Sequence, residues 1–284
     1  MSLPHLLHYH FMQNAYLAGT FVAIAAGAIG YFVVLRGQSF AGHSFANVGF
    51  AGATGAALIG APPVVGLLGG GMLAAAGMHW LGLGVRDTAR SDSAIGAILS
   101  ASLALGYLFL YLSHVAYGAA IYDVLFGNVL GVSDYGVLAS AVLTTALLLC
   151  LVISGRPLLF ASVDPTVAEG KGVPVRGLSL LFLTLLAVMV AAAVQVVGVL
   201  LIFSLLVTPA ATSRYLSNKP AAAMAMSMGI AVLSTWAGLA AGYYTPWPIS
   251  FYIASFGFAA YVAARAWRAL SGRRNGAGRA NPSA

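Results

Sequence analysis

The chain contains 284 residues, of which 61% are hydrophobic and 7% are charged, and its formal net charge at pH 7 is +7. Soluble domains carry about 25% charged residues, so this composition excludes an ordinary soluble globule and requires lipid as the solvent for much of the surface. The basic residues lie singly between apolar runs, a pattern that indicates membrane topology and argues against nucleic-acid binding.

Apolar runs of the length needed to span a membrane, about 20 residues, recur along the chain. In order they are Ala15–Leu35, Pro63–Leu83, Ile95–Ser113, Tyr135–Ser154, Leu178–Val196, Val197–Leu216, Ala221–Tyr243 and Ile249–Trp267. A further run, Gly42–Ala61, is apolar but glycine-rich, and we expect it either to span the membrane or to be re-entrant. The sequence therefore predicts an all-α, polytopic membrane helix bundle with eight or nine transmembrane helices.

The basic residues favour one orientation of this bundle. With nine spans, all 13 Lys and Arg residues fall on the same side, and the connections on the other side carry none. They lie at Arg36, Arg86, Arg90, Arg156 to Arg176, Arg214, Lys219 and from Arg265 onward. The positive-inside rule makes that side cytoplasmic. We therefore expect a multi-pass protein of the bacterial plasma (inner) membrane with its N-terminus outside and its C-terminus in the cytoplasm.

A short helix is predicted in the basic connection of residues 156–176. Asp164 followed by Pro165 is typical of a helix start, with the aspartate as N-cap and the proline at the first helical position. The helix is expected to run to Glu169, and Gly170 and Gly172 can end it. We expect it to be amphipathic and to lie across the cytoplasmic end of the bundle.

The chain divides into a transmembrane domain, residues 1–270, and a polar, glycine-rich, basic tail, residues 271–284, which is expected to be disordered. The sequence contains no phosphate-binding loop, no His-Glu-x-x-His pair and no Gly-x-Ser-x-Gly turn. It therefore predicts a protein that is not an enzyme and binds no cofactor of its own. If ATP drives its activity, a partner subunit must bind the nucleotide.

The clearest candidate for chemistry within a span is the pair His43 and Asn47. The two residues are four positions apart, so one face of a helix presents both. An imidazole ligates transition metals, whereas an amide oxygen is a weak, hard ligand. The alternative is that His43 bonds locally and Asn47 bridges two helices, and residue types alone leave both interpretations open.

A series of short motifs runs in order along the stretch from Phe11 to Arg265, the last of them ending at Thr212. The motifs are Phe11-Met12, Val33–Arg36, Gly42–Gly60, Ser93–Gly96, Leu125–Ser133, Val163–Pro165 with Gly172-Val173, Val197–Leu201 and Leu206–Thr212. Together they resemble the permease subunits of the zinc/manganese/iron ABC importers. The resemblance implies a type II-like ABC importer permease, a homo- or heterodimeric permease core, cytoplasmic ATP-binding subunits, and an extracellular or periplasmic metal-binding protein that delivers the ion.

The resemblance also implies roles for particular residues. In the family, the segment that corresponds to Asp164, Pro165, Glu169 and Gly172 is the coupling helix that the ATPase grips. The second span of the family typically carries Gly-Asp-Ala-Leu-Ser-His-Ala, whose acid and histidine are regarded as contacting the metal. Here the same stretch reads Gly42-His43-Ser44-Phe45-Ala46-Asn47-Val48. The metal-contacting positions are thus occupied by His43 and Asn47.

We expect a permease subunit that moves a divalent transition-metal ion, zinc or manganese, with ATP hydrolysed by its partners. The altered pair lacks the negative charge that attracts a divalent cation, which leaves open a metal chelate or another substrate of the same machinery. A secondary transporter is a third possibility. That class has buried acids near the middle of the membrane, whereas the six acidic residues here fall in expected loops or at span ends.

Overall fold

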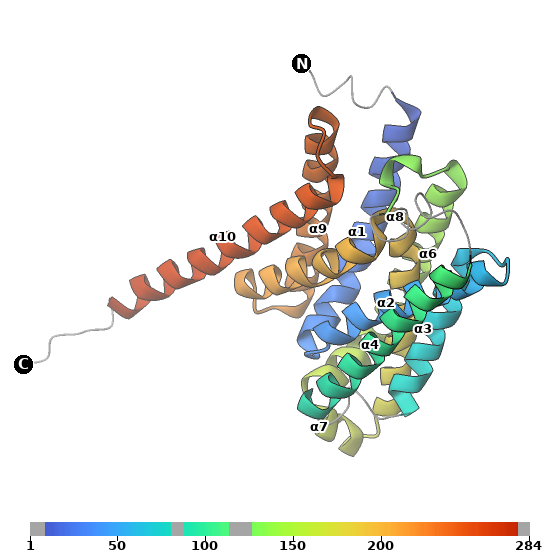
Figure 1. Ribbon diagram of the computed structural model, residues 1–284. Helices are drawn as coiled ribbons and strands as arrows, with labels where there is room; N and C mark the ends of the chain where they lie inside the picture. The colour runs from blue at the N-terminus through green and yellow to red at the C-terminus, as the bar shows by residue number, and fades with distance from the viewer. Residues whose placement is uncertain (1–8, 81–87, 114–126, 278–284) are drawn as a thin grey trace, which may run out of the picture.

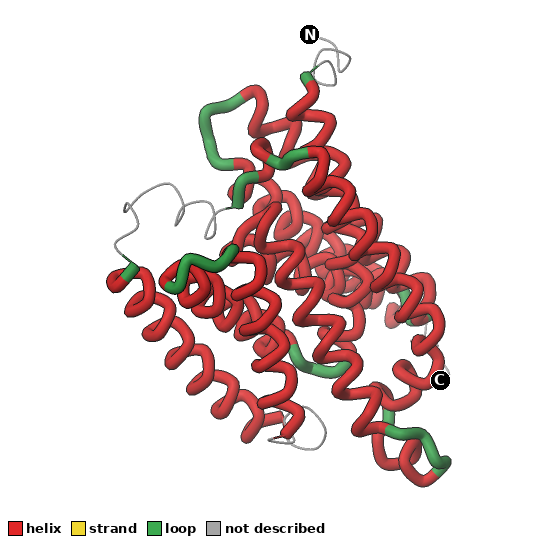
Figure 2. Tube along the Cα trace, turned by 90° about the vertical axis from the view of Figure 1, so that its right-hand side faces the viewer, coloured by secondary structure: helices red, strands yellow, loops and turns green. Residues whose placement is uncertain are grey.

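The computed structural model describes residues 9–80, 88–113 and 127–277, and within these ranges the secondary structure is entirely helical (Figure 1). The longer helices are α1 (His10–Leu35), α2 (Ser39–Leu58), α3 (Pro63–Trp80), α4 (Thr88–Leu112), α6 (Asp134–Val163), α8 (Val175–Leu216), α9 (Pro220–Tyr244) and α10 (Ile249–Ala277). Two short elements, η2 (Val129–Gly131) and α7 (Pro165–Gly170), precede α6 and α8. Figure 2 shows that the described segments between helices are short.

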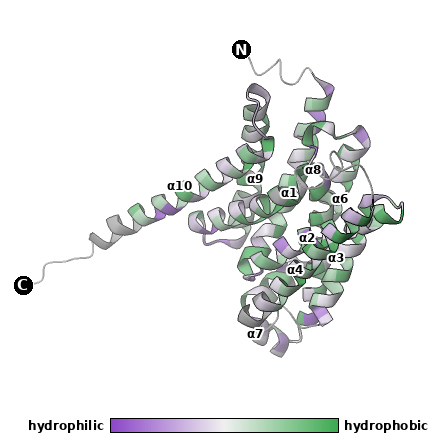
Figure 3. Cartoon of the chain, in the orientation of Figure 1, coloured by the Kyte–Doolittle hydropathy of each residue, from purple (hydrophilic) through white to green (hydrophobic). Residues whose placement is uncertain are grey.

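The prediction of an all-α, polytopic membrane protein is confirmed. Six described helical segments are long and apolar enough to cross a membrane, namely His10–Leu35, Ser93–Leu112, Asp134–Val163, Val175–Val199, Pro220–Tyr244 and Ile249–Leu270. Leu201–Leu216 is a shorter apolar helix, and α2 and α3 are helical without meeting the same threshold. Apolar residues cover most of the length of the helices (Figure 3), and large apolar side chains such as Leu73, Val152 and Ile153 are more than 70% exposed, as lipid contact allows.

A break in α8 separates the two apolar runs that the sequence places end to end. The backbone of Gly198 has φ 80° and ψ 164°, outside the helical region, although the helix continues on both sides. The chain before η2 lies directly against this break: a side chain on Gly127 would collide with the backbone of Val197 and Gly198. The boundary that the sequence predicts between residues 196 and 197 therefore lies within two residues of a break at Gly198, which divides α8 into two helical halves, Val175–Val199 and Leu201–Leu216.

The centre of the bundle is α1, which packs against α6, α8 and α9. Most of its buried positions are alanine or glycine, and small residues allow helix backbones to approach closely in lipid. At Gly27, for example, the backbone of Met228 in α9 leaves no room for a side chain, and the hydroxyl of Ser227 donates a hydrogen bond to the Gly27 carbonyl at 2.8 Å. The core thus depends on backbone contact more than on interlocked large side chains.

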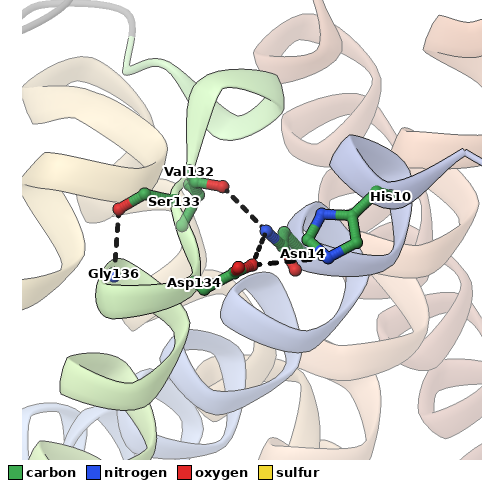
Figure 4. A network of polar contacts seen from close by, with 6 residues as sticks. All are labelled: His10, Asn14, Val132, Ser133, Asp134 and Gly136. Atoms are coloured by element: carbon green, nitrogen blue, oxygen red, sulfur yellow. Dashed lines mark hydrogen bonds and ion pairs between the residues drawn. The ribbon is translucent and has the colours of Figure 1, made fainter.

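The two ends of the bundle are defined by contacts between helix termini. At one end, the Asn14 side chain of α1 donates hydrogen bonds to the Val132 carbonyl (3.2 Å) and to Asp134 Oδ1 (2.7 Å), which places the starts of α1 and α6 side by side (Figure 4). At the other end, Leu35, Val163, Arg214 and Arg268 line one cavity. The basic ends of α1, α6, α8 and α10 therefore lie together, as the alternation of spans predicts.

The last helix, α10, runs away from the rest of the bundle toward the C-terminus (Figure 1). It continues to Ala277, past residue 270, where the sequence analysis places the start of a disordered tail. Residues 278–284 lie outside the described residues. The division into a transmembrane domain, residues 1–270, and a tail, residues 271–284, stays a prediction.

Helices α2 and α3 meet at a contact between two glycines. A Cβ atom on Gly66 would collide with the carbonyl oxygen of Gly52, and a Cβ atom on Gly52 would collide with that of Gly66. Because neither residue has a side chain, the two backbones touch along this line. The contact fixes α2, which carries the His43–Asn47 pair, against its neighbour.

Gly66→Ala is expected to destabilise the protein, because the added methyl group has no room against α2. Overpacking of this kind costs about 1–3 kcal/mol. Gly69→Ala on the same helix is the matched control, because nothing lies within 4 Å of its Cβ position. Thermal unfolding of the two variants in detergent measures the difference, and equal melting temperatures would contradict the close approach of α2 and α3.

Candidate functional site: the His43–Asn47 pair and the helix α7

The first turns of α2 bring His43 and Asn47 into contact. The Asn47 side chain is buried and donates a hydrogen bond to the His43 carbonyl at 2.9 Å, and its Nδ2 atom lies 3.4 Å from His43 Nε2. The prediction that one helical face presents both side chains is therefore correct. The local hydrogen bond that the sequence analysis left open as an alternative is also present, so the pair combines a structural contact with a half-buried imidazole.

The other ring nitrogen of His43 has no hydrogen-bond partner within the part of the chain that the structure describes. His43 Nδ1 is buried, and so is the hydroxyl of the next residue, Ser44, which also makes no hydrogen bond to a described residue. Buried polar atoms without partners are uncommon and costly in folded proteins. This turn of α2 holds two such atoms in consecutive residues, His43 Nδ1 and Ser44 Oγ.

The imidazole of His43 is oriented by an aromatic ring from the second half of α8. The centroids of His43 and Phe203 lie 5.2 Å apart, and the rings are inclined at 69°, an edge-to-face arrangement. Phe203 lies only a few residues beyond the break at Gly198. The geometry of α8 therefore decides where the His43 ring can point, a contact that nothing in the sequence indicates.

The ligand set around His43 is small. Across residues 9–80, 88–113 and 127–277, no three His, Cys, Asp or Glu side chains are grouped closely enough to hold a metal ion. Storage sites for transition metals use about four ligands. A single imidazole with one amide nearby can make a brief contact with a passing ion, because weak and replaceable ligands let an ion leave again.

The connection between α1 and α2 contains a buried cation, Arg36. The guanidinium group of Arg36, the last residue of the Val33–Arg36 motif, lies 4.8 Å from the centre of the Phe182 ring in α8. Its burial lowers the pKa of Arg36 to about 10, because the protein interior disfavours the charged form. The sequence analysis places Arg36 among the basic residues and at the end of a family motif, without a contact partner. In the structure its cation–π contact ties the base of α2 to α8.

The predicted short helix is present as α7. The carboxylate of Asp164 accepts a hydrogen bond from the Val167 backbone N–H at 3.0 Å, and Pro165 is the first helical residue. Gly172, with φ 80°, follows the end of the helix. Ala168 is fully buried and anchors α7 to the bundle, while Glu169 is exposed. The helix thus presents a rigid, solvent-facing surface at the basic end of the molecule.

The described chain is thus a polytopic helical bundle with a polar pair within it and a capped helix at its basic end. The model of the ABC 3 transport family matches residues 8–267, and the chain belongs to this family. The family resemblance found in the sequence is therefore confirmed. As a permease subunit, the chain is not itself an enzyme.

Relatives with assigned roles cover most of the chain. It is 32% identical over 234 residues to the manganese transport system membrane protein MntC of Halalkalibacterium halodurans, with 82% of this chain and 79% of the relative covered. It is also 32% identical to the manganese import system permease protein ScaB of Streptococcus parasanguinis, with 84% of each covered. A probable iron transport system membrane protein of Haemophilus influenzae is 28% identical, with 84% of this chain and 86% of the relative covered.

The fold also matches a solved structure, that of PsaBC from Streptococcus pneumoniae in complex with Fab. The TM-score is 0.81 and the sequence identity is 30%, with 92% of this chain and 93% of the solved chain covered. The likeness thus extends over nearly the whole chain.

Proposed function

We propose that this chain is the membrane-spanning permease subunit of an ABC importer for a divalent transition-metal ion, with manganese favoured and zinc the second candidate. The observation that carries the proposal is the combination of 32% identity to the manganese permeases MntC and ScaB with coverage above four-fifths of the chain. Membership in the ABC 3 transport family leaves the alternative of a secondary transporter without support.

His43 and Asn47 are proposed as the contact for the ion as it crosses. They occupy the positions at which the family typically carries an acid and a histidine, and the buried Nδ1 of His43 has no partner in the described part of the chain. An imidazole suits zinc and other borderline metals, whereas manganese prefers oxygen ligands. The pair therefore favours weak, transient binding, and a metal chelate remains the alternative substrate, since chelation supplies ligands that the pair lacks.

The energy for transport is proposed to come from partner subunits. We infer that a homo- or heterodimeric permease core binds two cytoplasmic ATPase subunits through Asp164, Pro165, Glu169 and Gly172 of the α7 segment. An external metal-binding protein would deliver the ion at the opposite end. The exposed surface of α7 and its cap at Asp164 support the first contact, because a docking helix must hold its shape without its partner.

The orientation follows from the same proposal. We infer eight or nine spans, an outer N-terminus and a cytoplasmic C-terminus, with α2, α3 and the second half of α8 completing the count. The gathering of the basic helix ends around Arg214 and Arg268 supports this arrangement, because basic residues are retained on the cytoplasmic side.

Single-cysteine labelling tests the orientation. In a Cys150→Ala background, Tyr135→Cys at the start of α6 is expected to react with an impermeant thiol reagent added to intact cells. Asn218→Cys, between α8 and α9, is expected to react only after the cells are opened. Both residues are exposed, so access to the reagent decides the result. Labelling of Asn218→Cys from outside would reverse the proposed orientation.

Glu169→Lys and Gly172→Pro are expected to weaken copurification of the ATPase subunit by about tenfold or more, the effect of losing roughly 1.4 kcal/mol at an interface. The first reverses a charge on the exposed surface of α7, and the second forces a negative φ where the backbone has φ 80°. Tyr135→Lys, at the exposed start of α6, is the control. Unchanged ATPase binding by both α7 variants would place the contact elsewhere.

His43→Ala is expected to lower manganese and zinc uptake by the full complex in vesicles by roughly tenfold, because it removes the one imidazole of the pair. Asn47→Ala should have a smaller effect, and Asn47→His should increase metal affinity by supplying a second imidazole. His79→Ala, another half-buried histidine in α3, controls for histidine loss in general. Wild-type uptake of both ions by His43→Ala would assign His43 to packing alone.

A further inference from the structure

A cavity of about 550 Å³ lies at the basic end of the bundle, where α1, α6, α8, α9 and α10 meet. It is separate from the His43–Asn47 pair, and none of the residues that line it is acidic. Its lining includes two arginines, Arg214 of α8 and Arg268 of α10, and the hydroxyl groups of Tyr215 and Tyr261. A chamber with two cations and no carboxylate in its lining attracts an anion.

The two arginines are held in position by the protein itself. Arg214 Nη1 donates a hydrogen bond to the Val34 carbonyl at the end of α1 (3.2 Å), and Arg268 Nη1 donates one to the Arg214 carbonyl (3.3 Å). The Arg268 guanidinium also lies 5.8 Å from the centre of the Tyr215 ring. Each guanidinium has five N–H donors, so these contacts fix the side chains and leave further donors for a ligand.

Neutral donors and an apolar wall complete the chamber. The hydroxyl groups of Tyr215 and Tyr261 lie 3.4 Å apart, and Asn218 adds an amide. The remaining lining is largely apolar, with Val34 and Leu35 from α1 and Leu159 and Val163 from α6. The site therefore offers charge and hydrogen bonds on one side and hydrocarbon contact on the other.

We propose that this cavity binds a phosphate group, carried by an anionic phospholipid or present as free phosphate. Arginine pairs suit phosphate because the planar guanidinium can donate two parallel hydrogen bonds to its oxygens. The lipid is the favoured source, because the chamber lies at the basic end of membrane-spanning helices and is half apolar. Basic pockets between such helices are typical sites for anionic headgroups.

Binding to the purified permease, measured by native mass spectrometry in detergent, tests the proposal. Dioleoyl phosphatidylglycerol is the lipid probe, dioleoyl phosphatidylcholine the neutral-lipid comparison, and inorganic phosphate the probe for a free anion. Retention of phosphatidylglycerol over phosphatidylcholine assigns a lipid. Binding of inorganic phosphate with no preference between the lipids assigns free phosphate, and both results support the site.

Arg214→Gln and Arg268→Gln are each expected to lower the binding affinity for the probe by about tenfold or more. This is the effect of losing one charge-assisted hydrogen bond. Arg156→Gln removes an exposed charge from α6 outside the cavity and should bind like the wild type. Arg214 also holds the end of α1, so Asn218→Asp provides a second variant that keeps both arginines and adds a repelling charge.

The proposal is overturned if neither probe binds, or if wild-type, Arg214→Gln and Asn218→Asp proteins bind equally. It is also overturned if the cavity variants leave lipid and phosphate binding unchanged and instead release the ATPase subunit. That outcome would assign the arginines to an acidic segment of the protein partner.

Discussion

Direct contact between helix backbones, with no side chain between them, holds this bundle in shape. Lipid gives helices no hydrophobic reason to associate, so packing must supply the attraction. The Gly52–Gly66 contact joins α2 to α3, and Gly27 receives the backbone of α9 together with a hydrogen bond from Ser227. These contacts determine the position of His43, because α2 packs against α3 through Gly52. The His43 side chain of α2 contacts α8 through Phe203.

The His43–Asn47 pair contains no carboxylate, and this absence determines its chemistry. An aspartate would attract any divalent cation through space, and a neutral imidazole does so only at close range. The Asn47 amide donates a hydrogen bond to the His43 carbonyl. This bond stabilises the helical turn that carries the His43 side chain. The ring packs on Phe203, and one of its nitrogens is buried without a partner in the described chain.

Much of this architecture could be predicted because it depends on local sequence. The apolar runs predict the helices, and Asp164 followed by Pro165 predicts the start of α7 at the residue where the structure has it. Sequence could not give contacts between distant segments: Phe203 against His43, Arg36 against Phe182, or the arginine cavity that five helices form. The join between the two apolar runs at residues 196 and 197 could be predicted from their lengths, but the sequence does not show that a single glycine, Gly198, turns the backbone there.

The break at Gly198 also lies between two parts of the molecule that carry candidate functional residues. The first half of α8 begins shortly after α7, and its second half carries Phe203, which touches His43. The chain from α7 to the ring that touches His43 therefore passes through one non-helical residue, Gly198. Gly127 packs directly against the backbone of Val197 and Gly198, so any side chain at residue 127 would have to displace the break itself.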